Sequence, residues 1–495
     1  GMRSLGLALL VLAFSASLAS AAVISIDDRF CGCDGSSGDE DTQFVVVTAQ
    51  SGEHNAITVE QRPRGVLVTD TGAPLTGACR PANSGGGRFC RGRFDGVNVS
   101  LGGGDDSLAS GVGGSVEGGP GDDQIHTGGA FSMLSGGPGA DLLDTTGSQG
   151  AAVTYADHTD GVTVRLNGVA DDGAAGEGDN VLGPVTGITG GGGNDRLEAG
   201  PTSSGLFGGA GDDVLVGSPQ GDSITAGEGN DTLTGGDGND HLNGGGGMDD
   251  IGGGDGFDEA SYAGATVPLM LSIGDGANDG AAGENDDIRD DVEALAGGSE
   301  NDVLVGTAGP NRLIAYGGQD VLRGGAGPDE LIGWDDGDEL DAGPGPDRVQ
   351  AGARDRPLLK DGEADTLDCR RHAPAIQADP IDELRACAPF VDVRPRGPLR
   401  NGRRATLAVR CPRESAVSCR GLMRVTTVGG RHISRRIRFG PIEPGSRAIV
   451  HVIIPTLRTG SCLVAAIRTR RSDGLRSVTE GRDTIGCLAV PRLPR

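Results

Sequence analysis

A nonapeptide that recurs in phase through the middle of the chain constrains its fold more than any other feature. Gly118–His126 reads GGPGDDQIH, Gly208–Val216 reads GGAGDDVLV and Gly324–Ile332 reads GGAGPDELI. The shared pattern is GGxGxDxUx, where U is aliphatic. The glycines permit a tight turn with positive backbone φ, and the xUx triplet is a short strand that buries one aliphatic side chain. The pattern therefore predicts a stack of turns and short strands.

The position-six aspartates recur every 18 residues in two interleaved series, so two nonapeptides form one coil. Equivalent aspartates are expected to stack along two edges of such a solenoid. We predict that these residues are the metal ligands of the protein: Asp123, Asp141, Asp195, Asp213, Asp222, Asp231, Asp240, Asp249, Asp258, Asp302, Asp320, Asp329, Asp338 and Asp347.

The aliphatic U positions predict a thin core that contains no large aromatic cluster. Aromatic residues make up only 3% of the 495-residue chain, whereas Gly contributes 92 residues. A chain of this composition is disordered, forms a fibrous repeat, or folds by binding cations. Because the nonapeptides keep a constant spacing, disorder is excluded. The side chains expected in the core are Ile125, Leu143, Leu197, Leu215, Ile224, Leu233, Leu242, Ile251, Leu304, Leu322, Leu331, Leu340 and Val349.

Stacked carboxylates of one sign would repel each other at the ~5 Å spacing of neighbouring coils. A cation between them would remove this repulsion. Carboxylate and turn-carbonyl oxygens, with no nearby His or thiolate, favour Ca²⁺ over Zn²⁺, and the flexible geometry also favours Ca²⁺ over Mg²⁺. The sequence therefore predicts multiple Ca²⁺ ions as cofactors.

Residues 101–352 resemble the haemolysin-type calcium-binding family, also called repeats-in-toxin (RTX). The resemblance implies an all-β fold, a right-handed parallel β-roll in which position-six aspartates and backbone carbonyls hold Ca²⁺ between successive turns. Ser132, Ser204 and Asn311 replace the Asp, and Glu300 replaces the fourth-position Gly. These turns are expected to be weak or empty, which leaves about eight good sites among the predicted ligands.

A longer repeat is superposed on the nonapeptides, since residues 155–195 match residues 262–302 at a constant offset of 107. Each copy carries an inserted strand, at 162–166 and 269–273, followed by an acidic glycine loop. The acidic pairs in these loops are either additional metal ligands or solvated charges. They are Glu177 with Asp179, and Glu284 with Asp286.

The segments before and after the repeats differ from the repeats in composition. Arg3, an apolar run over Leu5–Leu18 and the small residues Ala19–Ala21 resemble a Sec-type signal peptide. The expected organisation is a signal peptide at 1–21, a β-rich N-terminal cap at 22–100, the β-roll at 101–352, a transitional closing segment at 353–390 and a basic domain at 391–495. Cap strands are expected at 44–48, 56–60, 65–69 and 96–101.

The last segment is basic, whereas the rest of the chain is acidic. Residues 388–495 contain 22 Arg, no Lys and 6 acidic residues, a balance of +16 that leaves −44 on residues 1–387. Alternating runs predict an Ig-like β-sandwich with strands at 405–410, 422–428, 433–439, 448–454 and 462–469. The arginines form either a solvated face or a surface for a polyanion or cell-surface polymer, and no element typical of nucleic-acid recognition accompanies them.

Ten cysteines are expected to form disulfides, in keeping with export. Their spacing favours Cys79 with Cys90, Cys369 with Cys387, Cys411 with Cys419 and Cys462 with Cys487. Cys31 and Cys33 remain, and a bridge between them would be strained.

No HExxH motif and no GxSxG motif occurs, and no apolar run is long enough to span a bilayer. The sequence favours a secreted or cell-surface, non-enzymatic calcium-binding protein of structural or adhesion type. One alternative is a β-helical enzyme that acts on polysaccharides through acidic loop residues. The other is a toxin-related secreted fragment, although the apolar membrane-inserting region expected of a toxin is missing.

Overall fold

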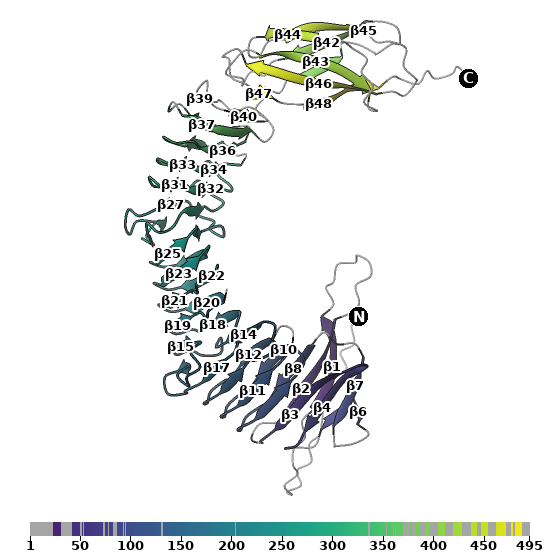
Figure 1. The fold of residues 1–495 in the computed structure, drawn as a ribbon, viewed down its shortest axis with the longest axis vertical. Coiled ribbons are helices and arrows are strands. Elements are labelled where there is room, and N and C mark those ends of the chain that lie inside the picture. Colours follow the sequence, from purple (N-terminus) through teal and green to yellow (C-terminus); the bar gives the residue numbers. More distant parts are fainter. Residues whose placement is uncertain are drawn as a thin grey trace, which may run out of the picture. The chain divides into compact units, whose positions relative to one another are not determined.

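A computed structural model provides the fold (Figure 1). It describes residues 23–30, 42–49 and 52–369, apart from 53, 73–74, 78, 83–86, 93, 95, 130–131, 203, 335–336, 353, 360 and 362, together with the backbone of β39 to β48 beyond residue 376. All regular elements in these residues are strands, as the repeat predicts. No helix that could cross a membrane occurs in this described part. The expected signal peptide, 1–21, lies outside it.

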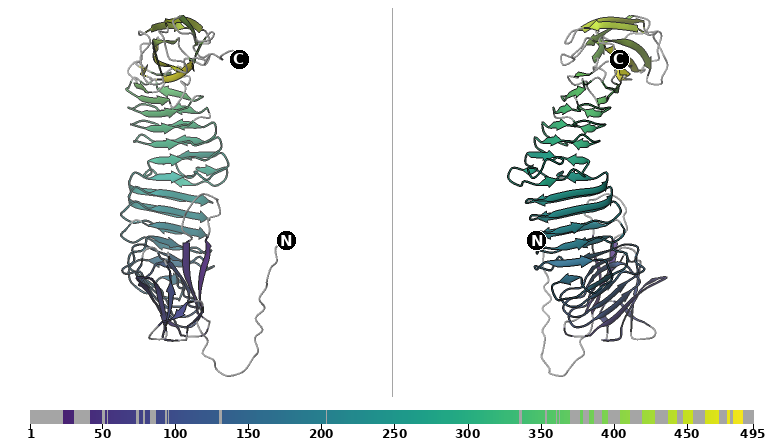
Figure 2. Two further views of the ribbon diagram at one scale, coloured as in Figure 1. Left: turned by 90° about the vertical axis from the view of Figure 1, so that its right-hand side faces the viewer. Right: turned by 60° about the vertical axis from the view of Figure 1, so that its left-hand side comes forward.

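The chain divides into two compact units, Gly1–Gly209 and Ala210–Arg495. The first unit is mainly a parallel β-solenoid (Figure 2). Its strands are β1 (Val23–Phe30), β2 (Thr42–Thr48), β3 (Ala56–Arg62), β4 (Gly65–Asp70), β5 (Thr76–Gly77), β6 (Arg80–Pro81), β7 (Arg88–Arg91), β8 (Gly96–Ser100), β9 (Ser107–Ser110), β10 (Gly114–Glu117), β11 (Gln124–Thr127), β12 (Ser132–Ser135), β13 (Leu142–Asp144), β14 (Ala151–Thr154), β15 (Val162–Arg165), β16 (Gly173–Ala174), β17 (Asn180–Leu182), β18 (Gly187–Thr189), β19 (Arg196–Glu198) and β20 (Gly205–Ala210).

The second unit also contains a parallel β-solenoid. Its strands are β21 (Val214–Val216), β22 (Ser223–Glu228), β23 (Thr232–Gly238), β24 (His241–Gly246), β25 (Asp250–Gly256), β26 (Glu259–Ser261), β27 (Leu269–Ser272), β28 (Gly280–Ala281), β29 (Asp287–Ile288), β30 (Ala294–Ala296), β31 (Val303–Val305), β32 (Arg312–Ile314), β33 (Val321–Arg323), β34 (Glu330–Ile332), β35 (Glu339–Asp341), β36 (Arg348–Ala351), β37 (Arg356–Leu359), β38 (Thr366–Cys369), β39 (Gln377–Ala378) and β40 (Glu383–Arg385).

The remaining strands of the second unit form two antiparallel sheets, except β47, which pairs in parallel with β40. β42 pairs with β41 and β45, while β43 pairs with β44 and β46, and β46 also pairs with β48. The five strands predicted in this segment overlap β42, β43, β44, β45 and β46. The strands are β41 (Asp392–Pro395), β42 (Arg404–Arg410), β43 (Cys419–Thr427), β44 (Ile437–Ile442), β45 (Arg447–Ile453), β46 (Cys462–Arg471), β47 (Ser477–Val478) and β48 (Gly481–Cys487).

Two nonapeptides make one coil because each strand pairs with the strand 18 residues further on. Gln124 of β11 lies opposite Leu142 of β13, and Ser223 of β22 lies opposite His241 of β24. The turns are close to their neighbours. Gly119 has φ 103°, and a Cβ at this position would overlap the carbonyl oxygen of Gly102 in the preceding coil. Only glycine fits such a turn without strain.

Parallel pairing already begins at β2 and β3, which pair with β8 and β9 respectively. Among the other strands before residue 96, β1 pairs antiparallel with β2, and β4 pairs antiparallel with β3 and β7. The segment at 353–390 continues the solenoid, because β37, β38 and β40 pair in parallel with the preceding strands.

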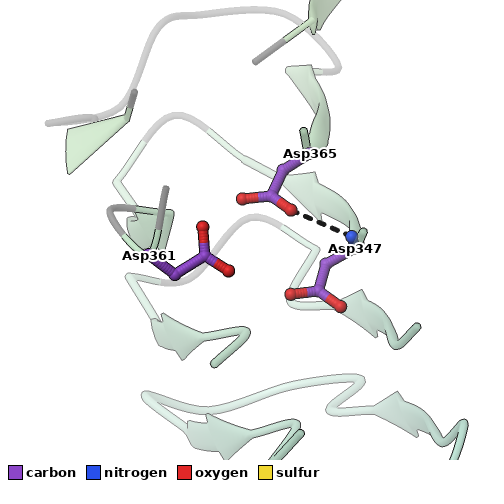
Figure 3. Close-up of side chains that lie close together, drawn as sticks. All are labelled: Asp347, Asp361 and Asp365. Atoms are coloured by element: carbon purple, nitrogen blue, oxygen red, sulfur yellow. Dashed lines mark hydrogen bonds between the residues drawn. The ribbon is translucent and has the colours of Figure 1, made fainter. Parts of the chain in front are cut away.

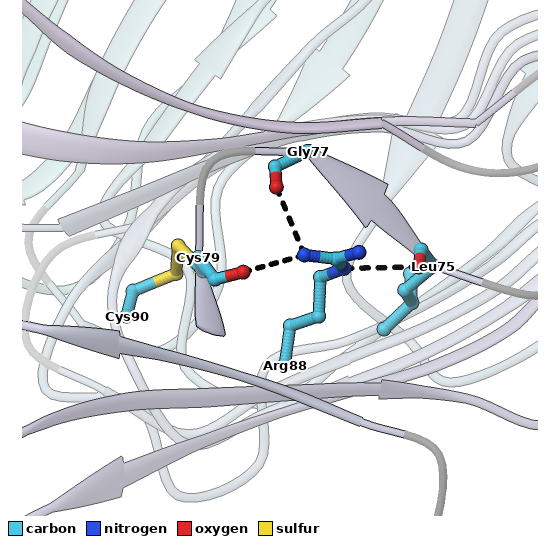
Figure 4. Close-up of a disulfide and its surroundings, with 5 residues drawn as sticks. All are labelled: Leu75, Gly77, Cys79, Arg88 and Cys90. Carbon is cyan, nitrogen blue, oxygen red and sulfur yellow. Dashed lines mark hydrogen bonds between the residues drawn. A yellow bond between two sulfur atoms is a disulfide. The ribbon is translucent and has the colours of Figure 1, made fainter. Parts of the chain in front are cut away.

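A disulfide between Cys79 and Cys90 is present in the N-terminal segment, with a Cα–Cα distance of 4.7 Å (Figure 4). Arg88 lies beside it and donates hydrogen bonds to the carbonyl oxygens of Leu75, Gly77 and Cys79, at 2.9, 2.9 and 2.5 Å. Cys462 and Cys487 are register partners of β46 and β48. The side chains of all eight remaining cysteines lie outside the described residues.

The duplicated segments form hairpin-like insertions in the coils. β15 pairs antiparallel with β16, and β17 then resumes the solenoid beside β13, with Leu142 opposite Asn180. The second copy repeats this arrangement, since β27 pairs with β28, and β29 lies beside β25 with Asp250 opposite Asp287.

The core consists of one aliphatic side chain per nonapeptide, as predicted. All thirteen predicted U residues are at most 1% exposed. Tyr155 and Tyr262 at the insertions are buried as well.

Candidate metal centres

All fourteen predicted ligand aspartates are buried, with exposed fractions between 0 and 4%. Each lies directly before the strand of its nonapeptide, where the glycine turn ends. Asp231, for example, precedes β23, and Asp240 precedes β24. The turn directs the side chain inward because it inverts the chain at that point, and the alternation of the strand then buries the aliphatic residue two positions later.

One carboxylate oxygen of these aspartates connects successive coils. In most of them the Oδ1 atom accepts a hydrogen bond from the backbone N–H of the position-six residue one coil earlier, whereas Asp195 and Asp302 accept from Val162 and Leu269 of the inserted strands. Asp123 N–H donates to Asp141 Oδ1 at 2.7 Å, and Asp231 N–H donates to Asp249 Oδ1 at 2.9 Å. The same bond joins Asp329 to Asp347 at 2.9 Å. Half of each carboxylate therefore serves the backbone ladder, independently of any ion.

The other oxygen, Oδ2, is in many turns buried without a hydrogen-bond partner among the described residues. It lies in a cradle formed by glycine: a Cβ at Gly118 would overlap both Asp123 Oδ2 and the carbonyl oxygen of Gly136. Two acceptor oxygens thus face the same small space, and an unsatisfied buried acceptor is costly. The aspartates whose Oδ2 has no partner in the described part of the chain are Asp123, Asp141, Asp231, Asp240, Asp249, Asp258, Asp329 and Asp347. Among them, Asp123, Asp240, Asp258 and Asp329 lie in a glycine cradle beside a carbonyl oxygen. The first position of the turn is Ala226 before Asp231 and Ala342 before Asp347.

A second group of turns satisfies Oδ2 with the protein's own backbone. Asp302 Oδ2 accepts the N–H of Gly298 at 2.7 Å, and Asp195 Oδ2 accepts the N–H of Gly191 at 2.6 Å. Asp222 Oδ2 accepts the N–H of Ser218 at 2.5 Å. In these turns an N–H group of the turn gives Oδ2 a hydrogen-bond partner. The two kinds of turn are not distinguished by the position-six residue, which is Asp in both.

Burial raises the pKa of the carboxyls that lack a second partner. The pKa is raised to about 7 for Asp123, Asp141 and Asp249, and to about 6 for Asp240. Burial is the main cause, and neighbouring carboxylates add to it, while the hydrogen bond from the backbone opposes it. A proton can therefore bind these carboxylates when no cation is present.

The donor set fits calcium. Buried carboxylate oxygens and turn carbonyls are hard ligands, and the flexible turns suit the irregular coordination of Ca²⁺. The ion would supply the positive charge that lets the stacked carboxylates remain ionised. The residues that would hold it are the aspartates whose Oδ2 has no partner, together with the first-position carbonyl one coil further on.

Further ladder residues lie outside the GGxGxD pattern. Their oxygens accept the N–H of the preceding position-six residue in the same way as the predicted aspartates do. Asp179 Oδ1 accepts from Asp141 at 2.8 Å, and Asp286 Oδ1 accepts from Asp249 at 3.0 Å. The shortened turn GEGD before Asp179 is the signal that could have identified it. Among the described residues, Glu293, Asp355 and Asp365 accept in the same way, and Asp106 accepts the N–H of Asn55.

The glutamates of the acidic loops have local partners. Glu177 Oε2 accepts the N–H of Ala174 at 2.8 Å and lies 3.2 Å from His158 Nε2. Glu284 Oε2 accepts the N–H of Ala281 at 2.6 Å. Asp179 and Asp286 thus belong to the ladder, whereas the two glutamates close their own loops.

The substituted positions keep their place in the stack. Ser132, Ser204 and Asn311 are each at most 4% exposed. Ser204 and Asn311 directly precede their strands, and Ser132 is the first residue of β12. Asn311 Oδ1 accepts the N–H of Thr307 at 2.6 Å, which resembles the self-satisfied aspartate turns. A neutral side chain is therefore tolerated at this position where no ion needs to be held.

Several segments of the chain match the RTX calcium-binding nonapeptide repeat family (4 copies). The matched residues are 117–147, 189–224, 207–242, 225–260, 296–331 and 315–349. No curated protein matches the chain significantly.

Proposed function

Since the chain carries haemolysin-type RTX calcium-binding repeats, we propose that it is an exported structural or adhesion-type protein whose roll folds on binding Ca²⁺ outside the cytoplasm. The observation that carries this proposal is the row of buried Oδ2 atoms without a partner among the described residues, several of them in a glycine cradle facing a carbonyl oxygen. Without a cation, such a row would be sustained only by protonation.

Export is supported by two features. RTX repeat proteins are typically exported, and the cysteines Cys79 and Cys90 form a disulfide, which persists in oxidising compartments. Outside the cell, free calcium is available when the chain emerges. Folding would then be coupled to secretion. Residues 1–387 have a net charge of −44, and the repulsion between these charges opposes folding until cations bind.

A non-catalytic role accounts for the acidic residues with the fewest assumptions. The carboxylates of the ladder are engaged by backbone N–H groups through Oδ1, and Glu177 and Glu284 close their loops. The alternative, an enzyme acting on polysaccharides, requires a carboxylate pair that binds no calcium and faces a groove. Activity screening on polysaccharides in the presence of calcium would distinguish that alternative.

The basic segment 391–495 supplies the second part of the proposal. Its balance of +16 suits a polyanionic cell-surface polymer, and its antiparallel strands are compatible with an Ig-like sandwich. Binding of the full chain to an anionic polysaccharide, measured as a function of salt, tests this part.

Calcium titration of the decalcified chain, followed by far-ultraviolet circular dichroism, tests the central proposal. The β-signal and the melting temperature are expected to rise with calcium and to fall again in excess chelator. An unchanged signal and melting temperature in chelator would contradict calcium-coupled folding.

A further inference from the structure

Three carboxylates converge at the end of the last matched nonapeptide (Figure 3). They belong to Asp347, Asp361 and Asp365, and one ligand oxygen from each lies within 4.8 Å of the others. Asp347 directly precedes β36 and Asp365 directly precedes β38, and these two strands pair in parallel. Asp361 comes from the turn that leads into Asp365.

The turn holds Asp361 in place through its backbone. Asp361 Oδ2 accepts the N–H of Gly345 at 3.1 Å, and Asp361 Oδ1 accepts the N–H of Glu363 at 2.8 Å. In the alignment of the two turns, Asp361 takes the position of Gly343, the second glycine of the nonapeptide. A carboxylate thus occurs where the repeat has no side chain, and its two backbone hydrogen bonds fix its orientation before any ion binds.

The buried member of the cluster is Asp347. It is 2% exposed, and its Oδ1 atom accepts the N–H of Asp329. Its Oδ2 atom has no hydrogen-bond partner among the described residues and faces the other two carboxylates (Figure 3). Burial, together with the charges of Asp329, Asp361 and Glu363, raises the pKa of Asp347 to about 7, although the hydrogen bond from the N–H of Asp329 opposes the shift. Three like charges at this separation require a counter-charge when ionised.

The dimensions of the cluster suit calcium. Ca²⁺ binds its oxygen ligands at about 2.3–2.6 Å, so two of its ligands lie at most about 5 Å apart. The oxygens of the cluster satisfy this limit as they are placed. Calcium affinity increases with the number of carboxylate ligands and with the rigidity of the site.

We propose that Asp347, Asp361 and Asp365 bind a calcium ion at a site that the nonapeptide pattern does not encode and that joins the coil of β38 to that of β36. The proposal rests on the calcium-binding function proposed above. Because it has three carboxylates, this site fills at lower free calcium than the turns of the repeat.

The test counts bound calcium per full-length chain, by equilibrium dialysis at increasing free calcium, for the wild type, Asp361→Asn and Asp368→Asn. Asp361→Asn retains an oxygen that can accept one of the two backbone bonds, whereas it removes the charge. Asp368→Asn is the matched control, since Asp368 lies on the same coil, in β38, and belongs to no cluster of three metal-ligating side chains in the described part of the chain. Asp361→Asn is expected to lose one ion, from the tightest class of sites, and Asp368→Asn none.

The outcomes separate this site from the function on which it rests. Calcium binding by the wild type with identical counts and affinities in Asp361→Asn would overturn the terminal site alone. An equal loss in both variants would also overturn it, because the effect would then follow net charge. A wild-type chain that binds no calcium would contradict the proposed function, and the terminal site with it.

Discussion

At the scale of single residues, each position-six aspartate performs two tasks with its two oxygens. Oδ1 belongs to a chain of hydrogen bonds to backbone N–H groups and is needed whether or not calcium is bound. Oδ2 is either left for a cation, as in Asp231, or satisfied by the turn, as in Asp302. A substitution that keeps Oδ1 and removes the charge therefore separates the ladder from the ion.

Asp231→Asn should reduce bound calcium, whereas Asp302→Asn should leave it unchanged. Asparagine keeps an acceptor for the N–H of Asp213 in the first case and for the N–H of Leu269 in the second. At a free calcium level tenfold above Kd, each lost site lowers the free energy of unfolding by about 1.4 kcal/mol. Calcium counting and thermal melting measure both effects. Equal losses in the two variants would show that the turn N–H does not replace the ion.

The raised carboxyl pKa values predict an inverted pH dependence in the absence of calcium. Carboxyls such as Asp123 and Asp249 have folded pKa values of about 7, above the usual range for aspartate. Between about pH 4 and pH 7 the folded state therefore binds more protons than the unfolded state, so stability falls as the pH rises through this window. With calcium present, the affinity for the ion should instead increase over the same range, because protons compete for Oδ2.

Circular dichroism of the decalcified chain across this pH range checks the expectation. The β-signal should be larger near pH 4 than above pH 7. A calcium-free chain that gains stability as the pH rises would show that its buried aspartates are ionised and paired in another way.

At the scale of the element, the turn is the unit that determines whether Oδ2 has a backbone partner. The second and fourth glycines adopt positive φ, as in Gly236 and Gly238, with φ 116° and 127°. A Cβ at Gly236 would overlap the carbonyl oxygen of Ser218, one coil earlier. The close stacking of turns is what brings carbonyl and carboxylate oxygens of neighbouring coils together.

Gly236→Ala should destabilise the roll, while Gly264→Ala should not. The left-handed conformation costs a residue with a Cβ about 1–2 kcal/mol, and the overlap adds to this. At Gly264 an added Cβ would meet nothing within 4 Å. The calcium concentration at the midpoint of folding should rise for Gly236→Ala only. Identical midpoints for the two variants would mean that the turns are not closely stacked in solution.

Periodicity made much of this fold predictable, but not the choice between the two kinds of turn. The 18-residue spacing of the aspartates predicted the coil, the burial of Leu233 and Leu242, and the inward direction of Asp231. The insertions shift this spacing, so Asp179 and Asp286 could not be placed in the ladder from the repeat pattern. Whether Gly298 donates its N–H to Asp302 depends on the local backbone conformation, which the GGxGxD motif does not determine.

At the scale of the whole molecule, calcium ions bound between neighbouring coils are expected to act together. The stability of a solenoid is the sum of the intrinsic stability of each repeat and the interaction energy between neighbouring repeats. An ion between two turns therefore stabilises both. About eight independent sites at tenfold excess over Kd would contribute on the order of 11 kcal/mol, which is comparable with the whole stability of a typical domain. Removal of calcium should therefore unfold the roll cooperatively.

The basic segment should survive the removal of calcium. It contains no GGxGxD turn, and Cys462 and Cys487 are register partners in adjacent antiparallel strands, where a disulfide would contribute roughly 2–4 kcal/mol. Its positive charge also attracts the acidic roll at low salt, and this attraction fades as the Debye length falls to about 3 Å at 1 M salt. Limited proteolysis in chelator and high salt should thus degrade residues 101–352 and leave a fragment that begins near Val391. Digestion of the C-terminal segment first, or at the same rate as the roll, would mean that this segment depends on the calcium-bound coils for its own fold.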